Sequence, residues 1–518
     1  MSYELNVENI IINKPLKPSL LKSVLNTDVI VPDTKPDVAK ILQVNALSSV
    51  SEKYVQKDMI TVSGFVDYTI LYCADDETNE IKNIKFKAPF SQQIEANGIE
   101  QNSNNYVLSD VSHIEYDICN SRKISLKSVI SFETGIVGKT NVDSVSAISS
   151  TINIPCIEKE IDVLNMTVCS ESKFEITDEI NLGYSFETEP EVLKVDSRII
   201  PEEHKTMNGK VVVKGILDTD VLYLRDGDIC HIENQTPFTE VIDVNNLSPH
   251  MHTEIKYGFN SCECDFLQND DTGFSLKTDV NFNICVYEQT EHKILTDAYC
   301  PDYCFDIMYN NLDYFSVDDS FEKNFTVTAN IELDEKEPPI LKVYNLNAKP
   351  VIETVSPGDG YCVIDGYVDT KILYLSDDET RIVYSAAKKI PFSQKTEIKC
   401  IKPSSKCNAE ISMDNVGYII KSENIIEIRA SIKLSMMILK EQEINVISSI
   451  SIDEEKPVIK DNISGITIYF ADDSEKLWDV AKKYSTTVEE IIKANNLDEG
   501  STLSKGQRLM IPKRVNTL

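Results

Sequence analysis

The sequence has few of the residues that catalysis and metal binding most often use. Six histidines and one tryptophan occur in 518 residues. The histidines are scattered singly, and neither a His-Glu-x-x-His nor a Gly-x-Ser-x-Gly motif is present. Such chemistry needs suitable groups at close, regular spacing. We therefore expect no enzyme activity, no bound metal and no cofactor.

Positive charge is also scarce. The chain has 51 Lys and Arg against 84 Asp and Glu, a net charge of -33. This charge disfavours binding to nucleic acid or to an anionic membrane surface. No apolar run approaches the roughly 18 residues of a membrane-spanning helix, so we expect no membrane insertion. Residues 462–518 hold eight basic and eight acidic residues, so the whole acidic surplus lies upstream of them.

Cysteine spacing gives no sign of a disulfide framework. The thirteen cysteines are an odd number and do not recur at equivalent places along the chain. A secreted, disulfide-bonded repeat protein would show such recurrence. The N-terminus also lacks the basic and apolar regions of a signal peptide. We expect a cytoplasmic protein.

An eleven-residue segment occurs three times, at 62–72, 213–223 and 364–374. Each copy has a glycine at its third position and ends in Leu-Tyr. The glycines are 151 residues apart, and so are the tyrosines: Gly64, Gly215, Gly366, Tyr72, Tyr223 and Tyr374. Self-similarity at this long period indicates tandem domains rather than a solenoid.

The composition of these copies predicts antiparallel β-sheet. β-Branched and aromatic residues form short runs, and Asp, Asn and Gly separate the runs. A glycine inside a strand permits a bulge or the close approach of another backbone. We therefore assign the six repeated residues to the fold of each repeat. The expected fold is mainly β, with three antiparallel β domains.

The repeats and a change of character near the end suggest four units. An N-terminal arm or strand with the first repeat occupies 1–155, the second repeat 156–308 and the third 309–457. The last unit, 458–518, reads as strand 466–470, two helices and strand 508–512. A capping box of Thr487 and Glu490 opens the second helix.

The last unit resembles a LysM domain, from the strand at 466–470 through Asn495-Asn496-Leu497 to the strand at 508–512. The three repeats resemble an uncharacterised domain that is found in clostridial spore-coat proteins, where copies of it precede a C-terminal LysM domain. This resemblance implies a scaffold of the mother-cell cytoplasm that is recruited to the forespore surface. It also implies that the LysM-like domain docks the ATPase of the coat basement layer, with other coat proteins as further candidate partners.

Trp478 is the residue with the most open interpretation. Helical rotation places it at the edge of the apolar stripe, beside Lys482, so it either caps the core or anchors a partner. Our leading hypothesis is a partner-binding surface, which the change Trp478→Glu should abolish. Its candidate residues are Ile466, Tyr469, Lys476, Trp478 and Lys482. The alternative is a module that binds peptidoglycan or N-acetylglucosamine oligomers. We favour it less than binding to a protein partner.

Overall fold

The computed structural model describes residues 3–16, 21–75, 80–182, 189–267, 273–334, 337–376, 383–399, 401–458, 466–473, 475–498 and 502–512. The fold class predicted from the sequence is confirmed, because three β-rich repeats precede a small unit with two short helices. Neither helix in these ranges is long and apolar enough to cross a membrane.

The strands follow the same order in each repeat. The first repeat contains β1 (Tyr3–Leu16), β2 (Leu21–Ile30), β3 (Val38–Gln56), β4 (Met59–Ala74), β5 (Ile81–Glu95), β6 (Asn105–Asn120) and β7 (Lys123–Ser150). The second contains β8 (Cys156–Asn181), β9 (Glu191–Met207), β10 (Lys210–Arg225), β11 (Asp228–Asp243), β12 (His252–Phe266) and β13 (Gly273–Ala298). The third contains β14 (Tyr303–Glu332), β15 (Ile340–Pro357), β16 (Tyr361–Ser376), β17 (Val383–Glu397), β18 (Lys406–Ser422) and β19 (Ile425–Pro457).

Each repeat folds into a head of two antiparallel sheets. In the first repeat one sheet has the order β3-β4-β5, and the other pairs β2 and β6 with β7. The second and third repeats reproduce this arrangement with β9-β10-β11 and β12-β13-β8, and with β15-β16-β17 and β14-β19-β18. Side chains alternate between buried and partly exposed along β4, as a strand with one face in a core requires. The core of each head therefore lies between its two sheets.

The repeated glycines lie where a side chain has no room. A Cβ added to Gly64 would meet the carbonyl oxygen of Ser49, and would lie 2.9 Å from the Phe90 ring. A Cβ added to Gly215 or to Gly366 would likewise lie 2.9 Å from the Phe238 ring or 2.8 Å from the Phe392 ring. The strand pairing also shifts register beside each glycine. The expected bulge is present, and the ring of the next strand fills the space that the missing side chain leaves.

The repeated tyrosines are buried inside the heads. Tyr72, Tyr223 and Tyr374 are at most 2% exposed. The hydroxyls of Tyr72 and Tyr374 donate to the carbonyls of Pro36 and Pro338, each at 3.1 Å. In the first and third heads this bond fixes the segment that enters the head, and all three tyrosines are core residues, so the equal spacing of the copies reflects packing.

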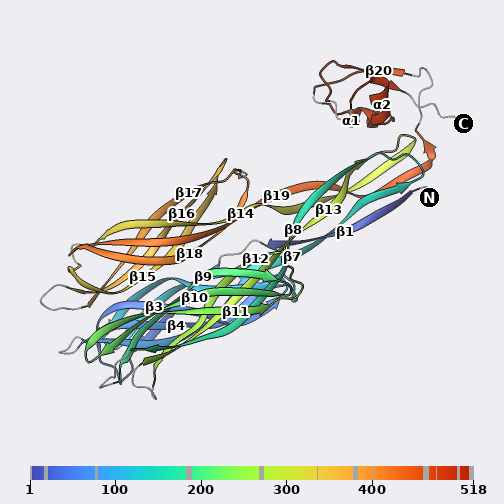
Figure 1. The fold of residues 1–518 in the computed structure, drawn as a ribbon. Helices are drawn as coiled ribbons and strands as arrows, with labels where there is room; N and C mark the ends of the chain where they lie inside the picture. The colour runs from blue at the N-terminus through green and yellow to red at the C-terminus, as the bar shows by residue number, and fades with distance from the viewer. Residues whose placement is uncertain are drawn as a thin grey trace.

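Long strands leave the heads and form a stalk (Figure 1). The stalk consists of three antiparallel ribbons: β1 with the end of β7, the start of β8 with the end of β13, and the start of β14 with the end of β19. Side chains from all six strands pack together inside it, including Ile12, Val163 and Tyr314. In the first repeat two strands, β1 and β2, pair with successive parts of β7. In the second repeat the single strand β8 pairs with β13 along both the stalk and the head. The predicted N-terminal arm is thus a stalk strand, and β14 begins at Tyr303, before the predicted start of the third repeat at 309.

The three heads meet around a common axis. Lys194 is 3% exposed and donates to the side-chain oxygens of Gln43 and Asn345, each at 3.2 Å. These three residues are 151 positions apart, so equivalent sites of the three repeats converge. Asp196, 2.5 Å from Lys194, neutralises the buried ammonium group. A buried charge is tolerated only when it is paired in this way.

Candidate functional site

The C-terminal domain contains β20 (Ile466–Phe470), α1 (Leu477–Lys483), α2 (Val488–Asn495) and β21 (Arg508–Pro512). The predicted capping box is confirmed, because the Thr487 side chain accepts from the Glu490 N–H and the Glu490 side chain accepts from the Thr487 N–H. Asn496 ends α2 in the left-handed conformation, with φ of 51°. The two helices and the two-stranded sheet of β20 and β21 bury a core that includes Val480, Ile491 and Leu509.

One residue of this core comes from the stalk. Tyr299 follows β13 directly, is 4% exposed and packs among the buried side chains of the C-terminal domain. Its hydroxyl donates to the Thr486 carbonyl at 2.8 Å. Its ring meets the Trp478 ring edge to face, with centroids 4.9 Å apart and an interplanar angle of 78°. The domain is therefore packed onto the end of the stalk.

Asp297 of the stalk binds the C-terminal domain through its carboxylate. Its carboxylate accepts from Trp478 Nε1 at 2.7 Å and from Lys482 Nζ at 2.6 Å. Burial raises the pKa of Asp297, but the hydrogen bonds from Lys482 and Trp478 outweigh burial and hold the pKa below its ordinary value. We call Trp478, Lys482 and Thr486 the docked face, because all three contact the stalk.

A second surface of the domain points to solvent. Alternate side chains of β20 are exposed: Ile466 by 56%, Ile468 by 58% and Phe470 by 62%. Met510 of β21, which pairs with Ile468 in the two-stranded sheet, is 38% exposed. We call these four residues the open face. Exposed apolar side chains gathered on one sheet face are typical of a protein interaction site.

The other two predicted binding residues lie beside α1. Tyr469 points away from the open face, and its hydroxyl donates to the Glu475 carboxylate at 2.8 Å. That hydrogen bond is the main reason why the pKa of Tyr469 rises to about 12. Glu475 also accepts from the Asp472 N–H at 3.1 Å, so Tyr469 helps to hold the loop before α1. Lys476 is the exposed N-cap residue of α1 and makes no side-chain capping bond.

The predicted binding residues are thus distributed over different surfaces. Ile466 lies on the open face, whereas Trp478 and Lys482 lie on the docked face. Sequence reasoning missed Asp297 and Tyr299, because their partners in the C-terminal domain lie 181 and 187 residues further along the chain. The signal that could have revealed them is the apolar triplet Ala298-Tyr299-Cys300, which is buried at the end of β13.

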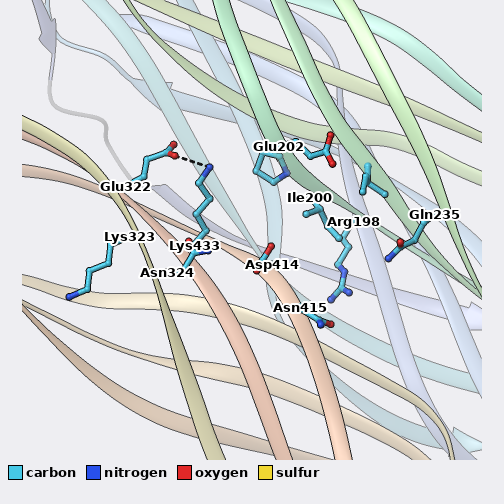
Figure 2. A pocket seen from close by; sticks show the side chains of 12 residues that line it. Arg198, Ile200, Glu202, Gln235, Glu322, Lys323, Asn324, Asp414, Asn415 and Lys433 are labelled. Carbon is cyan, nitrogen blue, oxygen red and sulfur yellow. Dashed lines mark ion pairs between the residues drawn. The ribbon is translucent and has the colours of Figure 1, made fainter.

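A polar cleft separates the second and third repeats (Figure 2). Its volume is about 770 Å³, and charged side chains from both repeats line it. Arg198 pairs with Asp218 at 2.6 Å, and Lys433 pairs with Glu322 at 2.9 Å. These four charges neutralise one another in pairs, so they stabilise the two walls of the cleft.

Comparison with known families agrees with this architecture. The family model described as "SipL, SPOCS domain" matches residues 37–119, 190–267 and 339–421. The model described as "LysM domain" matches residues 475–512. The chain is therefore a protein with three SPOCS domains followed by a LysM domain. No curated protein and no solved structure matches it.

Proposed function

We propose that this protein is a non-enzymatic adaptor for spore-coat assembly. It acts in the mother-cell cytoplasm at the forespore surface, where its LysM domain docks the ATPase of the coat basement layer. The three SPOCS domains carry the LysM domain at the end of the stalk and offer further surfaces to other coat proteins. The domain content supports this proposal, since SPOCS repeats ahead of a LysM domain match the resemblance found in the sequence.

The observation that carries the proposal is the open face of the LysM domain. Its four apolar side chains are exposed, whereas another aromatic residue of the same domain, Trp478, is partly buried against the stalk. A partner that covers the open face would gain the burial of Ile468 and Phe470, each worth about 1.5–3 kcal/mol when fully buried. Ile466, which the sequence analysis predicted to bind a partner, belongs to the same face and is also exposed.

The test is binding of the full-length chain to the purified coat ATPase. Phe470→Glu places a charge at the most exposed side chain of the open face and should abolish binding. The matched control is Met308→Glu, because Met308 is 69% exposed on the stalk and the change is of the same kind. Equal binding by Phe470→Glu and the unmodified chain would contradict the proposal.

Titration with N-acetylglucosamine oligomers separates the proposal from its alternative. The adaptor function predicts no saturable sugar binding. Glu475 already accepts from Tyr469 and from the Asp472 N–H in the loop before α1. Saturable sugar binding without ATPase binding would establish the carbohydrate-binding function instead.

A further inference from the structure

Three side chains with metal-binding atoms meet on the hairpin of β10 and β11. One ligand atom from each of Asp220, His231 and Glu233 lies within 4.8 Å of the others. Asp220 stands directly opposite Glu233 in the ladder, and His231 precedes Glu233 by two residues, so all three lie on one face of the hairpin. His231 Nε2 is 3.1 Å from Asp220 Oδ1.

The arrangement of charges favours a bound cation. Two carboxylates directly opposite each other in an antiparallel pair repel and destabilise it. The nearby guanidinium group of Arg198 is 2.6 Å from Asp218, which is a different carboxylate. A divalent cation between Asp220 and Glu233 would remove the repulsion, and the net charge of -33 increases the attraction for it.

The three side chains also line a cavity. It lies between the second and third repeats, has a volume of about 620 Å³ and is bounded on the far side by Tyr344 and Tyr418. A metal held by three protein side chains keeps at least one coordination position for water or another ligand. Here that position would face the cavity.

The other two repeats lack this cluster, although their hairpins have the same register. Strand pairing aligns Asp220, His231 and Glu233 with Thr69, Asn83 and Lys85 in the first repeat. In the third repeat the corresponding residues are Lys371, Ser385 and Ala387. Neither set contains a carboxylate or an imidazole. The fold of the repeat does not require the cluster, so its presence in the second repeat calls for a separate explanation.

We propose that Asp220, His231 and Glu233 bind a divalent first-row transition metal. One imidazole and two carboxylates suit Mn²⁺, Fe²⁺ or Zn²⁺. Mg²⁺ is less suited, because it prefers oxygen ligands and gives up its waters reluctantly. Sequence reasoning overlooked this site, because the ligands join only when the hairpin pairs residues 220 and 233.

The test is Mn²⁺ binding to the full-length protein under reducing conditions. Binding is measured as the loss of the electron paramagnetic resonance signal of free Mn²⁺. Mn²⁺ is the probe because cysteine thiolates prefer softer metals. We expect one saturable site per chain. His231→Asn should weaken it at least about tenfold, as the loss of a ligand requires.

The variants are chosen so that the protein still folds. Asparagine occupies the position of His231 in the first repeat, and alanine occupies that of Glu233 in the third. His231→Asn and Glu233→Ala should therefore unfold at nearly the same temperature as the unmodified chain without metal, yet both should bind Mn²⁺ more weakly. His250→Asn is the control, because His250 is exposed and outside the cluster; its Mn²⁺ affinity should be unchanged.

Three results would overturn the assignment. The first is the absence of saturable Mn²⁺ binding. The second is equal affinity in His231→Asn, which would place the metal elsewhere. The third is complete displacement of Mn²⁺ by Mg²⁺ in about tenfold excess, which would mean that carboxylates alone hold a hard cation.

Discussion

The LysM domain turns one face toward the stalk and another toward solvent, and the two faces hold their aromatic side chains differently. On the docked face, Trp478 has a ring neighbour and an acceptor for its N–H, in Tyr299 and Asp297. On the open face, Phe470 remains 62% exposed. An aromatic residue at a domain surface can thus serve the chain's own assembly or a partner. The contacts around each ring, and not its type, distinguish the two roles.

The docked face and the open face should therefore have separate functions. The docked face should determine how firmly the domain sits on the stalk, and the open face should determine what it binds. Because Trp478 is the only tryptophan, its fluorescence reports on the docked face without any label. The variants below should affect docking in decreasing order.

Tyr299→Ala should have the largest effect on docking. It removes a buried ring from the core of the LysM domain and the donor to the Thr486 carbonyl. Loss of a large buried aromatic side chain costs about 3–5 kcal/mol. We expect Trp478 emission to shift to longer wavelength and acrylamide quenching to increase. Tyr418→Ala, which alters an exposed tyrosine of β18, should leave both unchanged.

Asp297→Asn should have an intermediate effect. The change removes the charge that both Trp478 and Lys482 contact, and hydrogen bonds to charged groups contribute about 1.5–3 kcal/mol each. Asparagine keeps one oxygen acceptor, so the loss should fall at the lower end of that range. Thermal unfolding followed by Trp478 emission measures it.

The same residue predicts a dependence on pH. The pKa of Asp297 is lower in the docked state than its ordinary value of 3.8. The charged Asp297 therefore contributes fully to the stability of docking well above pH 3.8. This contribution disappears as the pH falls through the lowered pKa. Trp478 emission of the unmodified chain should show this acid transition. A transition of the same size in Asp297→Asn would assign it to another group.

Lys482→Met should have a smaller effect. Lys482 is partly exposed, and its ion pair with Asp297 at 2.6 Å is open to solvent on one side. Exposed ion pairs contribute up to about 1 kcal/mol and are weakened by salt. We expect a small loss of docking at low ionic strength that shrinks in high salt. A loss independent of salt would indicate that the methylene groups of Lys482 matter more than its charge.

Phe470→Glu should have the least effect on docking and the greatest on the proposed partner. Substitutions on an exposed surface usually change stability by less than about 0.5 kcal/mol. Trp478 emission and the unfolding temperature should therefore match those of the unmodified chain. A marked loss of stability would show that Phe470 supports the sheet of β20 and β21, and the binding test would then need Ile468→Glu instead.

Much of the fold could be predicted because it depends on local patterns. The equal spacing of Gly64, Gly215 and Gly366 revealed the repeats, and each glycine lies beside the bulge that its place in a strand suggested. The LysM strands and the capping box at Thr487 were predictable for the same reason, since both depend on residues close in sequence.

The stalk and the sites depend on contacts between distant segments. Nothing near Lys194 indicates that Gln43 and Asn345 will surround it, because each is 151 residues away. Trp478 likewise meets Asp297 across 181 residues. Helical periodicity placed Trp478 at the edge of the apolar stripe, where capping the core and anchoring a partner were equally open. Only the position of the stalk shows which groups it contacts.

The most direct test compares two variants in one binding experiment with the purified coat ATPase. Trp478→Phe keeps an aromatic ring on Tyr299 but removes the N–H that Asp297 accepts, whereas Phe470→Glu changes only the open face. The account predicts that Trp478→Phe binds within about threefold of the unmodified chain, a difference below 1 kcal/mol, and that Phe470→Glu loses at least about a hundredfold. The reverse order, with Trp478→Phe impaired and Phe470→Glu unaffected, would contradict the assignment of partner binding to the open face.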